Sequence, residues 1–358
     1  MLKILTIVGA RPQFIKAAAL SREIAKHSDI SEIIVHTGQH YDYNMSDVFF
    51  TELEIPKPDY NLSIANLSHG AMTGRMLESI EQVILKEKPD IVLVYGDTNS
   101  TLAGALAAKK LHVKLAHVEA GLRHFDMQVP EEINRILTDR ISDMLFCPTD
   151  QTVKNLIAEG FENYGCKIFQ TGDVMYDAAL YYAPKAEKMP ETVDQIPKEK
   201  YILCTIHRAV NTDNPERLTS IFSALDDINE EIKVILPLHP RTKAIIEKER
   251  IKTNVSIIDP VGYFKMILLT KNCELIITDS GGLQREAYFW GKKSVLLYDI
   301  TAWVELVANG YAMTAGAEKE KILQTYKELK EKTPMPFSDI FGIGNASKLI
   351  VDKIINEI

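Results

Sequence analysis

Short runs of apolar, mostly β-branched residues alternate with longer amphipathic stretches along this chain, and this alternation limits its fold more than any other feature. Residues 91–94, Ile-Val-Leu-Val, are apolar at every position. A strand with one face in water would alternate apolar and polar residues, so this run is predicted to be buried on both faces of a helix-covered parallel sheet. The expected fold class is therefore α/β with doubly wound sheets.

The strand pattern occurs twice, which predicts two Rossmann-like domains. A chain of 358 residues also exceeds what one hydrophobic core usually supports. The segment 182–200 is rich in Pro, Lys and Glu, which is typical of a connection near a domain boundary. We expect an N-terminal domain over 1–172, a C-terminal domain over 173–345 and a final helix over 346–358 that packs on either domain. The expected strands are 3–8, 33–36, 91–95, 114–118 and 144–147, then 201–205, 234–237, 255–258, 275–278 and 294–298.

The composition argues against several classes of partner. The formal charge is −8 and the chain has no Lys/Arg block, so nucleic acid is not expected as a partner. No apolar run approaches the roughly 18 residues that a membrane span needs, and the first one, 4–8, is too short for a signal peptide. The four cysteines lie far apart, which predicts neither a metal site nor a disulfide framework. We therefore predict a cytoplasmic protein without a membrane partner.

Basic residues follow the first expected strand. Ligands of open α/β sheets bind outside the carboxyl ends of the strands. Arg11, in the segment Gly-Ala-Arg-Pro at 9–12, and Lys16 would face an anion at the start of the next helix. The alternative is a tight turn with two solvated cations. The segment matches neither a dinucleotide fingerprint nor a Walker loop, so the sequence supports neither NAD nor ATP, and no cofactor is predicted.

Three carboxylates follow later strands of the same half. Asp97 and Glu119 come directly after the strands 91–95 and 114–118, and Glu131 opens the following helical stretch. The alternatives are that Asp97 caps a helix and that Glu131 is a surface charge in a helical first turn. Carboxylates on successive loops at one sheet edge form a group that can carry out proton transfer.

The strongest local signal of the second half is a glycine turn. Ser280, Gly281 and Gly282 follow the apolar strand 275–278. Such a turn lets backbone N–H groups at a helix start approach a diphosphate closely. Glu286 comes one helical turn later, where a carboxylate can hold ribose hydroxyls. A plain glycine-rich turn would not need that acid.

Three further residues lie at strand ends of the second half. His207 and His239 follow the first two strands, and each is either a ligand contact or a structural histidine. Tyr263 follows the third strand, where it either meets a nucleotide base or packs in the core.

Taken in order, these motifs resemble the non-hydrolysing UDP-N-acetylglucosamine 2-epimerases. That family has the two-domain glycosyltransferase-B fold with a central cleft. The resemblance implies an enzyme that inverts carbon-2 of a UDP-linked 2-acetamido sugar for polysaccharide synthesis, as a homodimer and without a cofactor. It spans nearly the whole chain and is carried by Gly9-Ala10-Arg11-Pro12 with Lys16, Gln39-His40, Gly96-Asp97-Thr98, His117-Val118-Glu119-Ala120-Gly121-Leu122-Arg123, Pro130-Glu131-Glu132 with Asn134-Arg135, His207-Arg208 and Asp279-Ser280-Gly281-Gly282.

The resemblance assigns roles to individual residues. The catalytic group that it implies is Asp97, Glu119, Glu131 and His207. The substrate-contacting group is Arg11, Lys16, Arg135, Ser280, Gly281, Gly282 and Glu286, to which we add Tyr263. Some family members bind a second UDP-sugar as activator, and the positions that match this site are Gln39, His40, Arg75, Arg208 and His239.

Two segments depart from the common family pattern, which puts the substrate in question. Residues 209–213, Ala-Val-Asn-Thr-Asp, lack the usual Glu, and residues 298–305 replace the usual Arg-Asp-x-Thr-Glu-Arg-Pro-Glu. Residues 9–16 and 207–209 are more similar to the branch that acts on UDP-2,3-diacetamido-2,3-dideoxyglucuronic acid. The substrate is therefore this sugar nucleotide or UDP-N-acetylglucosamine.

The reaction that we expect is elimination and re-addition of UDP through a 2-acetamidoglucal, since a proton beside an acetamido-bearing carbon is too weakly acidic for simple removal. A retaining glycosyltransferase on the same scaffold is the main competing function, and it would not need the three acids. The sequence is also compatible with a hydrolysing epimerase and with a non-catalytic UDP-sugar-binding protein.

Overall fold

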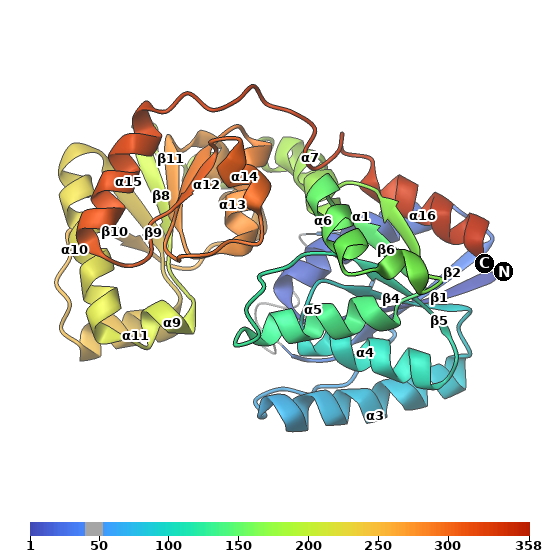
Figure 1. Cartoon of the computed structure of the whole chain (residues 1–358). Coiled ribbons are helices and arrows are strands. Elements are labelled where there is room, and N and C mark those ends of the chain that lie inside the picture. The colour runs from blue at the N-terminus through green and yellow to red at the C-terminus, as the bar shows by residue number, and fades with distance from the viewer. Residues whose placement is uncertain (40–52) are drawn as a thin grey trace. The chain divides into compact units, whose positions relative to one another are not determined.

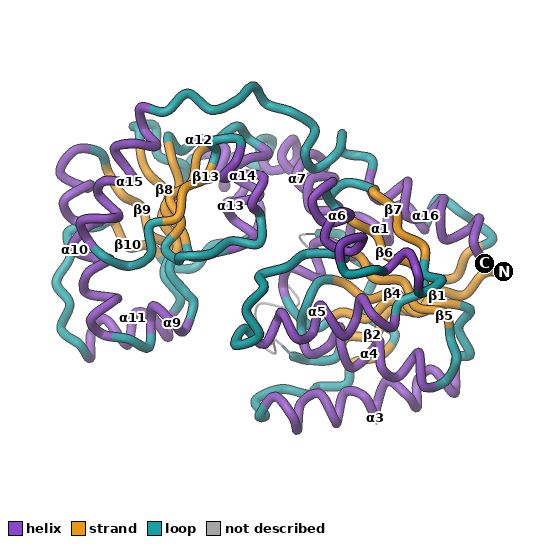
Figure 2. Tube along the Cα trace, in the orientation of Figure 1, coloured by secondary structure: helices purple, strands orange, loops and turns teal. Residues whose placement is uncertain are grey.

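A computed structural model describes residues 1–39 and 53–358 of the chain. These residues divide into two compact units, of which the first contains Met1–Leu180 together with Asp339–Ile358 and the second contains Tyr181–Ser338 (Figure 1). In each unit a central sheet carries helices on both faces (Figure 2). No helix in the described ranges has the length and apolarity needed to cross a bilayer.

The described strands of the first unit form one parallel sheet in the order β3-β2-β1-β4-β5-β6-β7. The order runs outward from β1 in both directions, so the loops after β1 and β4 diverge and leave room for a ligand at the carboxyl ends of these strands. The elements are β1 (Leu2–Val8), α1 (Arg11–Ile24), β2 (Ile30–His36), β3 (Tyr60–Asn61), α3 (His69–Glu87), β4 (Ile91–Tyr95), α4 (Asn99–Lys110), β5 (Lys114–Val118), α5 (Pro130–Ile141), β6 (Met144–Cys147), α6 (Asp150–Ala158), β7 (Lys167–Gln170), α7 (Val174–Ala186), which ends in the second unit, and α16 (Ala346–Glu357).

The second unit repeats this topology. Its parallel sheet has the order β10-β9-β8-β11-β12-β13, so β8 and β11 take the places that β1 and β4 hold in the first unit. The predicted α/β class with two Rossmann-like sheets is confirmed. The elements are α8 (Pro190–Val193), β8 (Tyr201–Thr205), α9 (Ala209–Thr212), α10 (Pro215–Glu231), β9 (Lys233–Pro237), α11 (Pro240–Lys248), β10 (Ser256–Ile258), α12 (Tyr263–Asn272), β11 (Leu275–Thr278), α13 (Gly281–Phe289), β12 (Lys293–Leu296), α14 (Val304–Ala308), β13 (Ala312–Thr314) and α15 (Lys319–Glu331).

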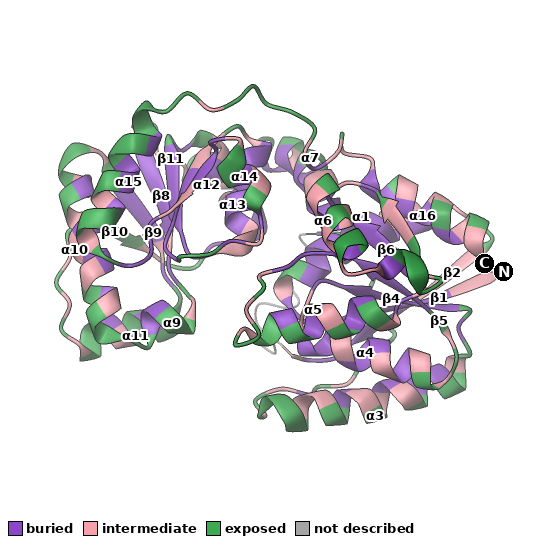
Figure 3. Cartoon of the chain, viewed as in Figure 1, coloured by how far each residue is buried: buried purple, intermediate pink, exposed green. Residues whose placement is uncertain are grey.

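Burial explains why the central strands were recognisable. Every residue of β4 and β11 is buried, and Figure 3 shows the strands of both sheets as the buried layer beneath more exposed helices. Removing this apolar surface from water stabilises each unit by roughly 25 cal/mol per Å². The residues at the strand ends lie just beyond these buried layers. The sheet therefore holds in place the backbone that carries their side chains.

The last helix belongs to the first unit. α16 packs against α1, and in Figure 1 the red helix lies beside the start of the chain. The carboxylate of Asp177 accepts hydrogen bonds from the N–H groups of Ala346 (3.1 Å) and Ser347 (2.7 Å), which satisfies two donors at the helix start. Asp173 N–H donates to the carbonyl of Phe341 (2.9 Å), so the returning segment is hydrogen-bonded to the end of the same unit.

One glutamine connects the loops that follow β1 and β4. The buried side chain of Gln13 accepts from the N–H groups of Gly9 (2.8 Å) and Ala10 (3.0 Å) through Oε1. Its Nε2 donates to the carbonyl of Tyr95 (2.7 Å) and to Thr101 Oγ1 (2.9 Å). The two loops are thereby held at a fixed separation.

Gly9 lies where the loop after β1 closely approaches neighbouring side chains. A Cβ at this position would lie 2.1 Å from Ser100 Oγ and 2.2 Å from Thr37 Oγ1, which are hydrogen-bonded to each other. We expect Gly9→Ala to lower the free energy of unfolding by about 1–3 kcal/mol, because these side chains must move apart. The control is Gly74→Ala in α3, where a Cβ meets nothing within 4 Å and helix propensity favours alanine. Thermal unfolding midpoints that fall equally in both variants would contradict this account.

Candidate active site

A buried ion pair lies at the carboxyl edge of the first sheet. Lys16 Nζ is 2.8 Å from Glu119 Oε2, and both side chains are less than a tenth exposed. Glu119 directly follows β5 and has a φ of +74°, in the left-handed region that non-glycine residues rarely adopt. Such a conformation costs of order 1 kcal/mol and persists where the surroundings hold it, often at functional sites. The structure therefore brings Lys16 and Glu119 together as neighbours.

Asp97 lies on the adjacent loop and pairs with Arg135. The Oδ2 atom of Asp97 accepts from Arg135 Nε (3.0 Å) and Nη2 (2.7 Å). Burial alone would lower the pKa of Arg135, but the carboxylates of Asp97 and Glu132 outweigh it and raise that pKa, so the guanidinium stays charged. Thr98, and not Asp97, caps α4 through its hydroxyl, so capping does not account for Asp97.

The neighbouring glutamates at the start of α5 have different surroundings. Glu131 is exposed, whereas Glu132 is fully buried. Glu132 accepts from Arg135 Nη1 (2.7 Å) with one oxygen and from the N–H groups of His124 (2.9 Å) and Phe125 (2.8 Å) with the other. Glu132 therefore connects the loop before α5 to the arginine that holds Asp97. Glu131 presents its carboxylate to solvent.

A buried aspartate organises the corresponding edge of the second unit. Asp279 directly follows β11 and accepts from the N–H groups of His207 (3.0 Å) and Arg208 (2.9 Å). It also lies 3.0 Å from His207 Nδ1, which directs Nε2 of the half-exposed imidazole away from this carboxylate. Burial alone would raise the pKa of Asp279, but His207 and the backbone donors outweigh it and lower that pKa.

The predicted glycine turn begins α13. Ser280 is its N-cap and accepts from Leu283 N–H (3.2 Å). A Cβ added at Gly281 or Gly282 would come no closer than 3.5 Å to its neighbouring atoms, and neither residue has a positive φ. Steric fit within the described chain therefore does not require glycine here. What the missing Cβ atoms provide is open access to backbone N–H groups at a helix start.

Arg208 extends over this turn. Its guanidinium stacks on the ring of Tyr298 at 4.6 Å from the centroid, and Nη2 lies 3.5 Å from the Cβ position of Gly281. Gln284 Nε2 donates to the Tyr298 hydroxyl (2.6 Å), and burial raises the pKa of that phenol to about 12. The glycine turn therefore lies beside the Arg208 guanidinium, which is stabilised by its cation–π contact with Tyr298.

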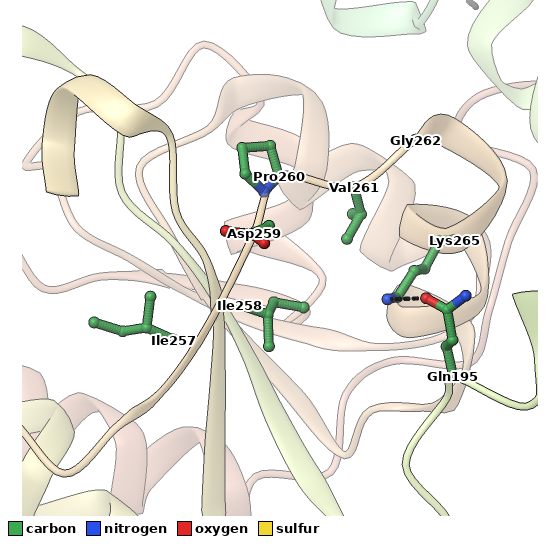
Figure 4. A pocket seen from close by; sticks show the side chains of 8 residues that line it. All are labelled: Gln195, Ile257, Ile258, Asp259, Pro260, Val261, Gly262 and Lys265. Atoms are coloured by element: carbon green, nitrogen blue, oxygen red, sulfur yellow. Dashed lines mark hydrogen bonds between the residues drawn. The ribbon is translucent and has the colours of Figure 1, made fainter.

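An open pocket of about 580 Å³ lies where β10 ends and α12 begins. Its lining includes the segment 257–262, and the side chains of Lys265 and Gln195 are hydrogen-bonded (2.6 Å) at one side of it (Figure 4). Tyr263 follows the pocket-lining segment, but its ring is 2% exposed and packs edge-on against Tyr182, 5.9 Å between centroids. This environment matches the expectation of core packing for Tyr263, and its contact with substrate stays a prediction.

The remaining predicted positions have varied surroundings. Gln39 accepts from Ser100 N–H (3.0 Å) and hydroxyl (2.7 Å), and His40 lies outside the described residues. Arg75 is exposed on α3, and Arg11 is partly exposed at the start of α1. His239 caps α11 through Nδ1 and is exposed. Glu286 is buried within α13. The described residues contain no group of three or more His, Cys, Asp or Glu side chains placed to hold a metal ion.

A family profile described as UDP-N-acetylglucosamine 2-epimerase matches residues 22–355. The chain belongs to this 2-epimerase family. It is 54% identical to the UDP-2,3-diacetamido-2,3-dideoxy-D-glucuronate 2-epimerase of Pseudomonas aeruginosa, with 99% of each protein covered. The resemblance inferred from the motifs is confirmed.

Solved structures of family members have the same fold. The crystal structure of the Methanocaldococcus jannaschii UDP-GlcNAc 2-epimerase in complex with UDP-GlcNAc and UDP matches with a TM-score of 0.92 and 42% identity, covering 99% of this chain and 100% of that one. The Neisseria meningitidis UDP-GlcNAc 2-epimerase bound to UDP-GlcNAc matches with a TM-score of 0.91 and 32% identity, covering 99% and 100%. The glycosyltransferase-B type of fold is thereby confirmed for this 2-epimerase chain.

Several residues that organise these strand-end loops were not among the predicted site residues. Gln13, Glu132 and Asp279 each hold two or more backbone or side-chain donors in place. His117 and Asp139 form a fully buried pair 2.7 Å apart. In the sequence these residues are recognisable only as polar residues near predicted ligand contacts. That pattern alone does not tell whether a side chain points into the protein or toward solvent.

The two glutamates of α5 allow a matched test of burial. Glu132→Gln keeps an oxygen for the two N–H groups but loses the charge facing Arg135, so we expect it to lower the free energy of unfolding by about 1–3 kcal/mol. Exposed Glu131→Gln should stay within about 0.5 kcal/mol of the unchanged protein. Thermal or urea unfolding measures both, and equal losses would refute the different burial of the two side chains.

Asp279 predicts a pH dependence of stability. Because its pKa is lowered in the folded protein, its contribution is fully present above the ordinary aspartate value of 3.8 and is lost as the pH falls below it. Asp279→Asn should lose about 1–3 kcal/mol at neutral pH, and its unfolding midpoint should fall less steeply under acid. The control is Asp227→Asn, which removes an exposed partner of Lys319 and should change little. Parallel acid profiles for Asp279→Asn and the unchanged protein would rule this out.

Proposed function

We propose that the protein reversibly epimerises carbon-2 of a UDP-linked 2-acetamido sugar without hydrolysing it. The observation that carries this proposal is the family match over nearly the full length of the chain. The Pseudomonas and Methanocaldococcus relatives carry 2-epimerase names, which favours this function over a retaining glycosyltransferase or a non-catalytic binder. The placement of Asp97 and Glu119 on loops after paired strands adds a physical reason, because proton transfer at a sugar ring needs fixed carboxylates.

The proposed reaction is an elimination followed by re-addition. A base takes the proton from carbon-2, the carbon-1 to oxygen bond breaks, and its electron pair leaves with UDP. The resulting 2-acetamidoglucal accepts a proton on the opposite face of carbon-2, and UDP adds back to carbon-1. The reaction is balanced without an oxidant, which agrees with the prediction that no cofactor takes part. Asp97, Glu119 and Glu131 are the proposed acids and bases.

The second unit is proposed to hold the UDP moiety. Backbone N–H groups of Ser280, Gly281 and Gly282 at the start of α13 suit a diphosphate that gains charge as it leaves. His207 is oriented by Asp279 and would donate to the same group through Nε2. Glu286 is proposed to hold ribose hydroxyls. The pocket lined by 257–262 has the size and polarity for a nucleobase.

Cationic side chains of the first unit are proposed to assist. Arg11 and Lys16 would face the diphosphate or the sugar, and Arg135 would set the position of Asp97. The ion pair of Lys16 with Glu119 suits this role, since a substrate phosphate can attract the lysine and free the carboxylate. These assignments place the acids, Arg11 and Lys16 in the first unit and the glycine turn, His207 and Glu286 in the second.

The sugar is one of two. The Pseudomonas relative, at 54% identity, is named for UDP-2,3-diacetamido-2,3-dideoxy-D-glucuronate, whereas the Methanocaldococcus and Neisseria structures contain UDP-GlcNAc. The departures at 209–213 and 298–305 favour the first sugar, whose carboxylate and second acetamido group need different contacts.

The proposal also covers the compartment, the oligomeric state, the pathway and the regulation of the enzyme. We propose a cytoplasmic homodimer that supplies a precursor for a surface polysaccharide, since nucleotide sugars are the substrates of such assembly. The cysteines at 147, 166, 204 and 273 are free thiols, which suits a reducing compartment. Regulation by a second UDP-sugar at Gln39, His40, Arg75, Arg208 and His239 is proposed by resemblance alone.

The experiment follows the sugar by proton NMR in deuterated water. Incubation with each UDP-sugar should give the carbon-2 epimer, with deuterium at carbon-2 and with UDP still attached. Asp97→Asn, Glu119→Gln and Glu131→Gln should each lower kcat by about 10²- to 10⁴-fold, as expected for general acid and base groups. Glu162→Gln, an exposed change in the first unit, is the control and should leave kcat unaltered.

Different results would point to a different activity. Free N-acetylmannosamine in place of its UDP form means a hydrolysing enzyme. Transfer of the sugar to an acceptor without deuterium at carbon-2 means a glycosyltransferase. Full activity in all three carboxylate variants would remove these residues from the mechanism.

A further inference from the structure

His117, near the end of β5, belongs to a buried network for which the proposed elimination has no use. Its side chain is 0% exposed, so it does not meet substrate directly. Nδ1 lies 2.7 Å from Asp139 Oδ1, and Nε2 lies 2.7 Å from the carbonyl oxygen of Gly96. Asp139, on α5, is also fully buried and accepts from Arg123 Nη1 (2.7 Å).

The hydrogen-bond partners of His117 define which ring nitrogen must carry a proton. The Gly96 carbonyl can only accept a hydrogen bond. Burial alone would raise the pKa of Asp139, but His117 and Arg123 outweigh it and lower that pKa, so the carboxylate is ionised. Nε2 must therefore carry a proton to donate to the Gly96 carbonyl, while Nδ1 faces the Asp139 carboxylate. Arg123 pairs in turn with Glu159 (2.6 Å), so His117, Asp139, Arg123 and Glu159 form one connected group. Such a group is costly to disturb, because removing one member leaves another without its partner.

The network ends on the two loops that carry Asp97 and Glu119. Gly96 has a φ of +61° and directly precedes Asp97. Gly121 has a φ of +79°, follows Glu119 by two residues and donates its N–H to Asp139 Oδ2 (3.1 Å). His117 therefore holds the left-handed turn at Gly96, and Asp139 holds the left-handed turn at Gly121.

We propose that His117 is a positioning residue, whose Nε2 bond to the Gly96 carbonyl sets the places of Asp97 and Glu119 for the reaction. This inference rests on the proposed function. The bond restrains the peptide that joins Gly96 to Asp97, and the same imidazole ring holds Asp139, which fixes the turn after Glu119. A displacement of about 1 Å in a reacting group can cost on the order of 100-fold in rate, so the network acts on catalysis without touching substrate.

Two variants separate positioning from simple support of the core. In His117→Gln the amide nitrogen reaches about where Nε2 lies and can still donate to the Gly96 carbonyl. In His117→Asn the amide nitrogen lies about where Nδ1 lies and can donate only to Asp139. Each variant loses one of the two hydrogen bonds of the ring, so both should lower the unfolding midpoint to a similar extent.

The expected result is a difference in kcat at similar stability. His117→Asn should lose about 100-fold in kcat, whereas His117→Gln should stay within about 10-fold of the unchanged enzyme. KM and the affinity for UDP, measured by calorimetry, should change by less than about 3-fold in both, because the glycine turn, His207 and Glu286, which are proposed to bind UDP, lie in the second unit. A kcat that follows the unfolding midpoint alike in both variants would overturn the inference.

A measurement on the unchanged protein tests the bond without relying on a folded variant. In protein labelled with ¹⁵N-histidine, His117 should show a proton on Nε2, the nitrogen that faces the Gly96 carbonyl. An Nε2 atom without a proton would overturn the inference. If the unchanged enzyme incorporates no deuterium into either UDP-sugar, the proposed function itself fails and the inference falls with it; an active enzyme whose two variants keep full kcat overturns the inference alone.

Discussion

Parallel pairing of β1 with β4, and of β8 with β11, is the constraint on which the rest of the structure depends. Parallel strands end at the same edge of their sheet, so loops from distant parts of the sequence meet there. Because the strand order runs outward from this central pair, the loops that follow its two strands diverge and leave room for a ligand. The acids of the first unit and the glycine turn of the second are products of this one topology, used twice.

Buried carboxylates give each edge its final shape. Asp139 and Glu132 in the first unit, and Asp279 in the second, each accept backbone N–H groups from a loop that carries a proposed site residue. Each also has a basic partner, Arg123 for Asp139, Arg135 for Glu132 and His207 for Asp279. In Asp139 and Asp279 the hydrogen bonds and nearby basic groups outweigh burial and lower the pKa. Loop residues are usually mobile, and these internal hydrogen bonds restrain the loops.

The sequence predicted the interior of both sheets better than their edges. The fully buried runs at 91–95 and 275–278 were recognisable because every position is apolar, whereas β3, β7 and β13, each at a sheet edge, were not predicted. These three strands are partly exposed and lack a continuous buried run, whereas β10, at the other edge of the second sheet, was predicted as 255–258. Motif spacing placed Asp97, Glu119 and the glycine turn, but it did not distinguish buried Glu132 from exposed Glu131. That difference depends on tertiary contacts with the loop at 124–125.

The position of α16 has a consequence for how the chain is made. Because Ala346–Glu357 packs on α1, the second unit is an insertion within the first, and the first unit is complete only after the whole second unit has been synthesised. A nascent chain therefore exposes the face of α1 that packs on α16 until the residues of α16 emerge from the ribosome. The second unit, which is continuous in sequence, has no such delay, so the later half of the protein has the simpler route to its native state.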